Sequence, residues 1–88
     1  MRSIAFAASF RRACLIHAPD GSPQALLVRN TLATLRGADE LPGPRDEADL
    51  AFPWRRFFTR AVKGTDLVLL YEIGEDIVVI HGVRLASW

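Results

Sequence analysis

The residues best suited to chemistry lie in the last third of the chain, where cationic and aromatic side chains are interleaved. The cations there are Arg55, Arg56, Arg60 and Lys63. They surround Phe57 and Phe58, and arginine beside exposed rings can bind phosphates and stack on bases. If the rings face the protein core instead, the arginines are solvated charges on an edge strand that discourage aggregation. The residues alone leave both interpretations open.

A second candidate pair, His81 and Arg84, lies near the C-terminus on either side of Gly82. Histidine titrates near neutral pH and transfers protons readily, and a neighbouring arginine can hold an anion. The glycine between them leaves the backbone accessible. A partly buried histidine with one backbone hydrogen bond would account for the same residues, so a single histidine is a weak sign of catalysis.

No metal, cofactor or covalent nucleophile is expected. His17 and His81 are far apart in the sequence, and neither HExxH nor CxxC spacing accompanies them. Cys14 is the single cysteine, which excludes an internal disulfide, and its apolar neighbours predict a small core residue. The glycines are scattered at predicted turns, without the spacing of a phosphate-binding loop.

The 88 residues and 9.8 kDa allow a single domain, which we place at 1–88, and its core must be thin. Half of the residues are hydrophobic and 24% are charged, which is typical of a globular protein. The apolar runs are shorter than the roughly 20 residues that span a bilayer, and arginines interrupt the N-terminal apolar stretch. We therefore expect a cytoplasmic protein with no membrane span and no secretory signal.

The net charge of +1 conceals a strong segregation along the chain. Residues 1–36 contain five arginines and one acid, residues 37–53 contain five acids and one arginine, and residues 54–66 contain four cations and one acid. Ten of the eleven cations are arginines, whose planar guanidinium suits phosphates and carboxylates, although GC-rich coding would produce the same bias. A basic patch therefore requires a fold that brings the first and third blocks together.

Hydrophobic periodicity and turn residues predict a strand, two helices and three further strands. The expected strands cover residues 2–7, 54–62, 67–73 and 76–84, the helices run from 8 to 18 and from 23 to 36, and the loop is 38–53. The predicted fold class is a two-layer α+β domain of order β-α-α-β-β-β, in which a helical hairpin packs on an antiparallel sheet. Strict alternation puts Arg56 and Arg60 on one face of their strand, and His81 and Arg84 on opposite faces of the last strand.

Three segments resemble the C-terminal half of the RelE/ParE toxin superfamily. These are Arg55-Arg56-Phe57-Phe58, Leu67-Val68-Leu69-Leu70-Tyr71-Glu72-Ile73 and Ile77-Val78-Val79-Ile80-His81-Gly82-Val83-Arg84. Phe6 and Phe10, followed by a helical hairpin, are similar to the first half of that family, and the order of elements agrees over nearly the whole chain. The resemblance implies the growth-inhibiting toxin of a bacterial toxin–antitoxin pair, neutralised by a cognate antitoxin.

Two activities occur in this superfamily, and the resemblance favours the ParE-like branch, which inhibits DNA gyrase. The ending from His81 to Arg84 looks like that branch. Val68 stands where RelE-like enzymes usually carry an arginine, and the chain ends soon after Arg84 without the tail tyrosine that they often have. The residues then expected to bind the target or the antitoxin are Arg55, Arg56, Arg60, His81 and Arg84.

The alternative is a RelE-like endoribonuclease that cleaves mRNA in the ribosome. In that case Arg56, Arg60, Lys63 and Arg84 would bind and polarise the phosphodiester, and His81 would move a proton. A third possibility is a non-catalytic binding module that keeps only the fold. The predicted site requires that Arg56, Arg60 and Arg84 come together on one outward surface of the sheet.

Overall fold

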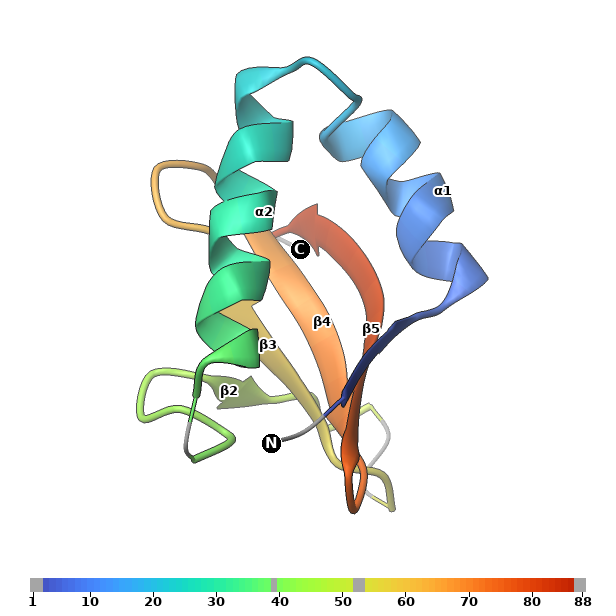
Figure 1. Ribbon diagram of the computed structural model, residues 1–88, viewed down its shortest axis with the longest axis vertical. Helices are drawn as coiled ribbons and strands as arrows, with labels where there is room; N and C mark the ends of the chain where they lie inside the picture. Colours follow the sequence, from blue (N-terminus) through green and yellow to red (C-terminus); the bar gives the residue numbers. More distant parts are fainter. Residues whose placement is uncertain (1–2, 39, 52–53, 87–88) are drawn as a thin grey trace.

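Two helices cover one face of a five-stranded sheet, and neither helix covers the other face (Figure 1). The computed structural model describes residues 3–38, 40–51 and 54–86. In chain order the elements are β1 (Ser3–Phe6), α1 (Ala8–His17), α2 (Pro23–Arg36), β2 (Glu47–Ala48), β3 (Phe57–Ala61), β4 (Leu67–Ile73) and β5 (Ile77–Leu85). The predicted two-layer α+β fold and the order β-α-α-β-β-β are confirmed, with β2 as an additional strand of two residues.

The sheet is mixed, in the order β1-β5-β4-β3-β2. β3, β4 and β5 form the predicted antiparallel meander, and β2 pairs antiparallel with β3. β1 joins the edge of β5 as predicted, but it runs parallel to β5, whereas we expected an antiparallel sheet throughout. Hydrophobic periodicity shows which residues share a face and contains no information on strand direction, which explains this difference.

The acidic segment predicted as a loop is attached to the outer edge of the sheet. β2 pairs with Thr59 and Phe58, and the amide of Asp49 donates to the carbonyl of Phe57 (2.9 Å). An edge strand has unpaired N–H and C=O groups, and the passing chain satisfies some of them. Leu41, near the start of the segment, lies in the core, so the segment is held at both ends.

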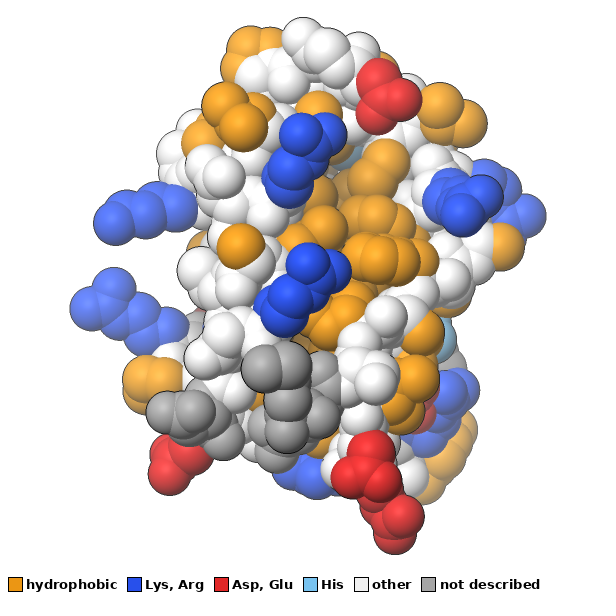
Figure 2. Space-filling view, viewed as in Figure 1, with side chains coloured by type: hydrophobic (Ala, Val, Ile, Leu, Met, Phe, Trp, Pro, Cys, Tyr) orange, Lys and Arg blue, Asp and Glu red, His pale blue; other side chains and the backbone are white. Residues whose placement is uncertain are grey.

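Both helices begin near the predicted residues. Ser22 caps α2: its Oγ accepts a hydrogen bond from the amide of Ala25 (3.2 Å), and Pro23 is the first helical residue. At the start of α1, the Oγ of Ser9 donates to the carbonyl of His81 (2.5 Å), which ties this helix to β5. Figure 2 shows hydrophobic side chains between the two helices, with Lys and Arg along the margins. No helix in the described part of the chain is long and apolar enough to cross a membrane.

The central strand β4 separates the two faces of the sheet. Its residues alternate strictly, with Leu67, Leu69, Tyr71 and Ile73 buried on the helix side and Val68, Leu70 and Glu72 partly exposed on the uncovered face. The other buried core side chains on the helices and β5 are Phe10, Val28, Leu35, Val78, Ile80 and Val83, together with Ala18 directly after α1. The prediction of a central strand over 67–73 is confirmed.

The strand predicted at 54–62 is shorter in the structure, because β3 begins at Phe57 and ends at Ala61. The predicted alternation holds within it. Phe58 packs against the core, and Phe57 lies on the uncovered face, where it pairs with Glu72 of β4. One ring therefore faces the core and the other does not.

A β-bulge interrupts the pairing of β4 with β5. Leu70 pairs with Gly82 and Tyr71 pairs with Ile80, so His81 is the extra residue between them. The bulge re-aims every side chain that follows it in β5, because side chains of a strand alternate between its faces.

The bulge explains why one sequence-based expectation is wrong. Ile80 and Val83 are both buried, although they are three residues apart and strict alternation would separate them. Arg84 pairs with Val68 and therefore shares the uncovered face with His81. The expectation that His81 and Arg84 lie on opposite faces assumed an uninterrupted strand.

Replacing Ile80 with alanine should lower the free energy of unfolding by about 2–5 kcal/mol, because the fully buried side chain would leave a cavity. Ile77 of the same strand is 38% exposed and provides the matched control, with an expected loss of about 1 kcal/mol or less. Urea unfolding followed by circular dichroism measures both. Equal losses for the two variants would contradict the placement of Ile80 in the core.

Candidate functional site

Glu72 is the centre of a polar cluster on the uncovered face of the sheet. Arg55 donates two hydrogen bonds to its carboxylate, from Nε to Oε2 at 2.8 Å and from Nη2 to Oε1 at 2.6 Å. The Nε2 of His81 lies 3.0 Å from Oε1 of the same carboxylate. The hydrogen bond from Arg55 holds the pKa of Glu72 below its usual value, against the effect of burial and with help from His81. An ionised carboxylate is thus shared by the guanidinium of Arg55 and the imidazole of His81.

The ring of Phe57 packs against both partners of Glu72. The guanidinium carbon of Arg55 lies 4.6 Å from the ring centroid, and the His81 ring meets Phe57 at 4.9 Å in a T-shaped arrangement. Phe57 is buried and pairs directly with Glu72 across β3 and β4. The segment before β3 and the strands β3, β4 and β5 each contribute one residue to this cluster.

A second ion pair lies further along the same face. Nη2 of Arg84 is 3.6 Å from Oδ2 of Asp49, and 46% of the Arg84 side chain is exposed. Arg84 pairs with Val68, whose backbone is about 13 Å along β4 from that of Glu72 at the usual rise of a strand, whereas the amide of Asp49 is bonded to Phe57, the residue that pairs with Glu72. A cavity of about 390 Å³ adjoins Arg84, with Thr59 in its lining. The uncovered face therefore has two ion pairs, Arg55–Glu72 and Arg84–Asp49.

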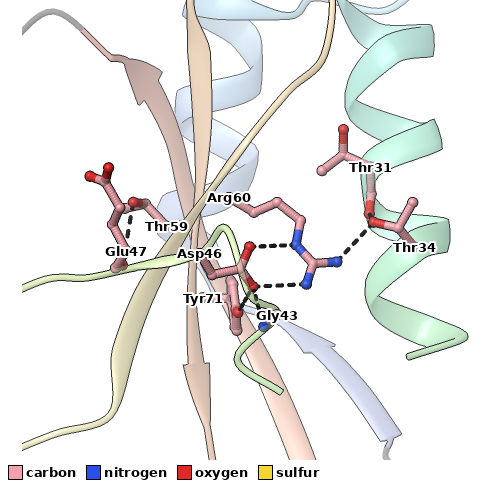
Figure 3. A network of polar contacts seen from close by, with 8 residues as sticks. All are labelled: Thr31, Thr34, Gly43, Asp46, Glu47, Thr59, Arg60 and Tyr71. Atoms are coloured by element: carbon pink, nitrogen blue, oxygen red, sulfur yellow. Dashed lines mark hydrogen bonds and ion pairs between the residues drawn. The ribbon is translucent and has the colours of Figure 1, made fainter. Parts of the chain in front are cut away.

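Arg60 belongs to a different network, on the helix side of the sheet (Figure 3). Its Nε and Nη2 each donate to an oxygen of Asp46 at 2.8 Å, and its Nη1 donates to Oγ1 of Thr34 at 3.0 Å. The hydroxyl of Tyr71 and the amide of Gly43 donate to the same carboxylate. Only 3% of the Asp46 side chain and 17% of the Arg60 side chain are exposed. This network fastens the acidic segment to β3, β4 and α2.

The same contacts determine the charge state of the network. Burial by itself raises the pKa of Asp46, but the hydrogen bonds from Arg60, Tyr71 and Gly43 outweigh it and hold that pKa below the ordinary value. Burial and the hydrogen bond to Asp46 raise the pKa of Tyr71, so its phenol stays protonated. An ionised Asp46 therefore sits between a guanidinium and a neutral phenol.

The structure brings together some of the predicted site residues and separates others. Arg55 and His81 are in one cluster, and Arg84 shares their face of the sheet. Arg60 lies on the opposite face, so the expectation that Arg56, Arg60 and Arg84 converge on one surface is wrong. The alternation of β3 and the bulge of β5 direct Arg60 and Arg84 to different sides.

Two more of the predicted residues lie outside the cluster. Lys63, in the turn after β3, lines a cavity of about 490 Å³ beside α2, together with Arg60. Arg56 is exposed just before β3, and no hydrogen bond or ion pair involves its side chain among residues 3–38, 40–51 and 54–86.

Sequence reasoning missed the carboxylates. Glu72 had a signal, since it is a lone acid inside an otherwise apolar strand. Asp46 and Asp49 had none, because a run of acids next to prolines and glycine is typical of any solvated loop.

The sequence predicted a core position for Cys14 and no metal site. Cys14 is partly buried and packs against the core, and burial, with a smaller effect of Asp20, raises the pKa of its thiol. Over the described ranges, no group of three His, Cys, Asp or Glu side chains is placed to hold a metal ion.

Comparison with known proteins identifies the fold. No protein-family model matches the sequence, and no curated protein matches it. YafQ from E. coli strain BL21(DE3) matches with a TM-score of 0.74 at 14% identity, over 99% of this chain and 96% of that chain. The E. coli DinJ–YafQ complex matches with a TM-score of 0.76 at 14% identity, over 99% and 96% of the two chains. A copper-bound mutant toxin from Helicobacter pylori matches with a TM-score of 0.66 at 23% identity, over 99% and 97%. The chain thus shares its fold with YafQ and with the Helicobacter pylori toxin.

Replacing Asp46 with asparagine should lower the free energy of unfolding at pH 7 by about 1–3 kcal/mol, because Arg60 and Tyr71 lose a shared acceptor in a buried site. A folded-state pKa below the ordinary 3.8 stabilises the protein above that pH, and the contribution is lost as the pH falls through the folded pKa. Wild-type protein should therefore lose more stability than the variant between roughly pH 5 and pH 2.

Urea unfolding across this pH range tests the difference. Asp66→Asn, which changes an exposed acid in the turn before β4, is the control and should behave as wild type at every pH. Parallel pH curves for wild type and Asp46→Asn would show that Asp46 does not clamp the acidic segment.

Proposed function

We propose that this chain is the toxin of a bacterial toxin–antitoxin pair and that it acts as an endoribonuclease on mRNA in the ribosome. It shares its fold with YafQ, which also occurs in a DinJ–YafQ complex, and with a toxin from Helicobacter pylori. Toxins of the RelE-like branch cleave mRNA with cationic residues on a sheet face. The observation that carries the proposal is the 3.0 Å contact between His81 and Glu72 on the uncovered face of this sheet.

In this mechanism His81 is the general base. Glu72 accepts a hydrogen bond from Nε2 of the neutral ring, which leaves Nδ1 free to accept a proton. When Nδ1 takes the proton of a ribose 2′-hydroxyl, that oxygen attacks the adjacent phosphorus and the bond to the next 5′-oxygen breaks, with water supplying the proton to the 5′-oxygen. The products are a 2′,3′-cyclic phosphate and a 5′-hydroxyl. Glu72 is a positioning residue that fixes the tautomer and stabilises the imidazolium.

The two arginines of this face have different roles. Arg55 gives two short hydrogen bonds to Glu72 and keeps that carboxylate ionised. Arg84 makes a single, longer contact with Asp49, so its remaining donors are available to a phosphate. Arg84 therefore supplies a phosphate-binding cation on the same face of the sheet as His81.

Inhibition of DNA gyrase is the second candidate function, and one residue favours it. Val68 lies on the uncovered face between Ala61 and Arg84, at the position where RelE-like enzymes usually carry an arginine. An apolar residue there suits contact with a protein target better than contact with RNA. The structural neighbours add no support for gyrase as a partner, so we rank this function second.

The purified protein should cut mRNA only when ribosomes are present, as measured by primer extension. His81→Ala should slow cleavage by about 100-fold or more, because it removes the general base. His17→Ala changes the other histidine, at the end of α1, and should leave cleavage unchanged. Inhibition of supercoiling by purified gyrase, without ribosome-dependent cleavage, would replace the first candidate function with the second.

A cognate antitoxin should stabilise the folded chain. Leu15, Ile16 and Leu26 remain exposed on the helices, where a partner would bury them. Adding the protein encoded beside this gene should raise the melting temperature, with a gain of about 2.7 kcal/mol when the free partner is at 100 times its Kd. The affinity should also fall as salt increases, because the exposed cations are screened. An unchanged melting temperature would argue against this partner, and a salt-independent affinity would indicate a purely apolar interface.

A further inference from the structure

The guanidinium of Arg55 is held in a fixed plane, which is unusual for a surface arginine. Its Nε and Nη2 donate to the two carboxylate oxygens of Glu72, so one edge of the group is fully used. One face of the group lies over the ring of Phe57, 4.6 Å from the ring centroid. Even so, 45% of the Arg55 side chain is exposed. The second face of a flat cationic group is therefore presented to solvent.

A nucleobase suits this arrangement better than a phosphate does. Glu72 already occupies the Nε–Nη2 edge of the guanidinium, and its negative charge repels a second anion from the N–H groups that remain. The open face keeps its full capacity to stack on a heteroaromatic ring and to make a cation–π contact. The chemistry of Arg55 therefore differs from that of Arg84, whose donors remain available.

The open face also lies beside the proposed general base. Nη2 of Arg55 and Nε2 of His81 both contact Oε1 of Glu72, and Phe57 packs against both side chains. A base stacked on Arg55 consequently belongs to a nucleotide that adjoins His81. Holding that base fixes the ribose next to the atom that removes its proton, which is how a binding subsite assists a cleavage reaction.

We propose that Arg55, supported by Phe57 and locked by Glu72, is a stacking platform for one nucleobase of the RNA substrate. The inference rests on the proposed ribonuclease function for the identity of its ligand, and it deepens that function by assigning a base subsite beside His81. The subsite takes any base, because stacking uses the ring face that all four bases share.

Adenosine 5′-monophosphate and ribose 5-phosphate test the platform, since both carry one phosphate and only the first has a base. In an NMR titration the intact chain should bind the nucleotide at least about fivefold more tightly than the sugar phosphate. The shifts should centre on the Arg55 Nε–H and the Phe57 ring. Arg55→Lys keeps the charge and removes the plane, so its affinities for the two ligands should become equal. Arg29→Lys makes the same exchange on the exposed surface of α2 and should bind both ligands as wild type does.

If wild type binds the nucleotide and the sugar phosphate with equal affinity, Arg55 is not a stacking platform. The proposal is also wrong if Arg55→Lys still prefers the nucleotide. Glu72→Gln is a second variant, in which Arg55 keeps its charge but its guanidinium is held less firmly. Its preference for the nucleotide over the sugar phosphate should therefore fall. In the ribosome assay Arg55→Lys should slow cleavage, and unchanged cleavage would overturn the assignment of the ligand to RNA. A wild type that prefers the nucleotide but never cuts mRNA would retain the platform and refute the ribonuclease function, so the two failures are distinct.

Discussion

The alternation of side chains along β4 keeps two polar networks apart. Tyr71 and Glu72 are successive residues, so the pleat directs the phenol toward the helices and the carboxylate toward the uncovered face. On the helix side Tyr71 donates to Asp46, which also accepts from Arg60, and on the other side Glu72 accepts from Arg55. A shift of β4 by one residue would exchange these faces, so that Arg55 would lose its acceptor Glu72 and Asp46 would lose the hydrogen bond from Tyr71. The register of the central strand therefore underlies both the stability of the acidic segment and the candidate site.

The bulge in β5 completes the uncovered face. Opposite Leu70 and Tyr71 the chain inserts His81, which places the imidazole within 3.0 Å of Glu72 and returns Val83 to the core. Without the extra residue, Val83 would lie among the polar groups and the cation that follows it would be turned toward the helices. A local irregularity thus serves packing and chemistry together, which is a common use of bulges beside functional sites.

The uncovered face is a set of ion pairs and not a bare basic patch. Arg55 is bound along a whole edge by Glu72, whereas Arg84 meets Asp49 at a single distance of 3.6 Å. In the proposed function an RNA phosphate would compete with Asp49 for Arg84, whose single contact is longer than either hydrogen bond of Arg55 to Glu72. The bidentate pair of Arg55 with Glu72 is harder to break, so the Nε–Nη2 edge of Arg55 is not available to a phosphate. Arg55 and Arg84 therefore differ in how firmly a carboxylate holds them, although the two side chains are chemically identical.

The sequence by itself determined the elements, their order and the α+β class, because hydrophobic periodicity and signals such as the cap at Ser22 act over only a few residues. It also indicated His81 as a candidate for proton transfer. Only the tertiary structure decided the parallel direction of β1, the bulge, the placement of Arg60 under α2 and the carboxylates that the cations bind. Glu72 was visible as a lone acid in an apolar strand, and Asp46 was one acid among several. Their partners come from segments distant in the chain, and an ion pair depends on distance and burial in space, which neighbouring residues in the sequence do not specify.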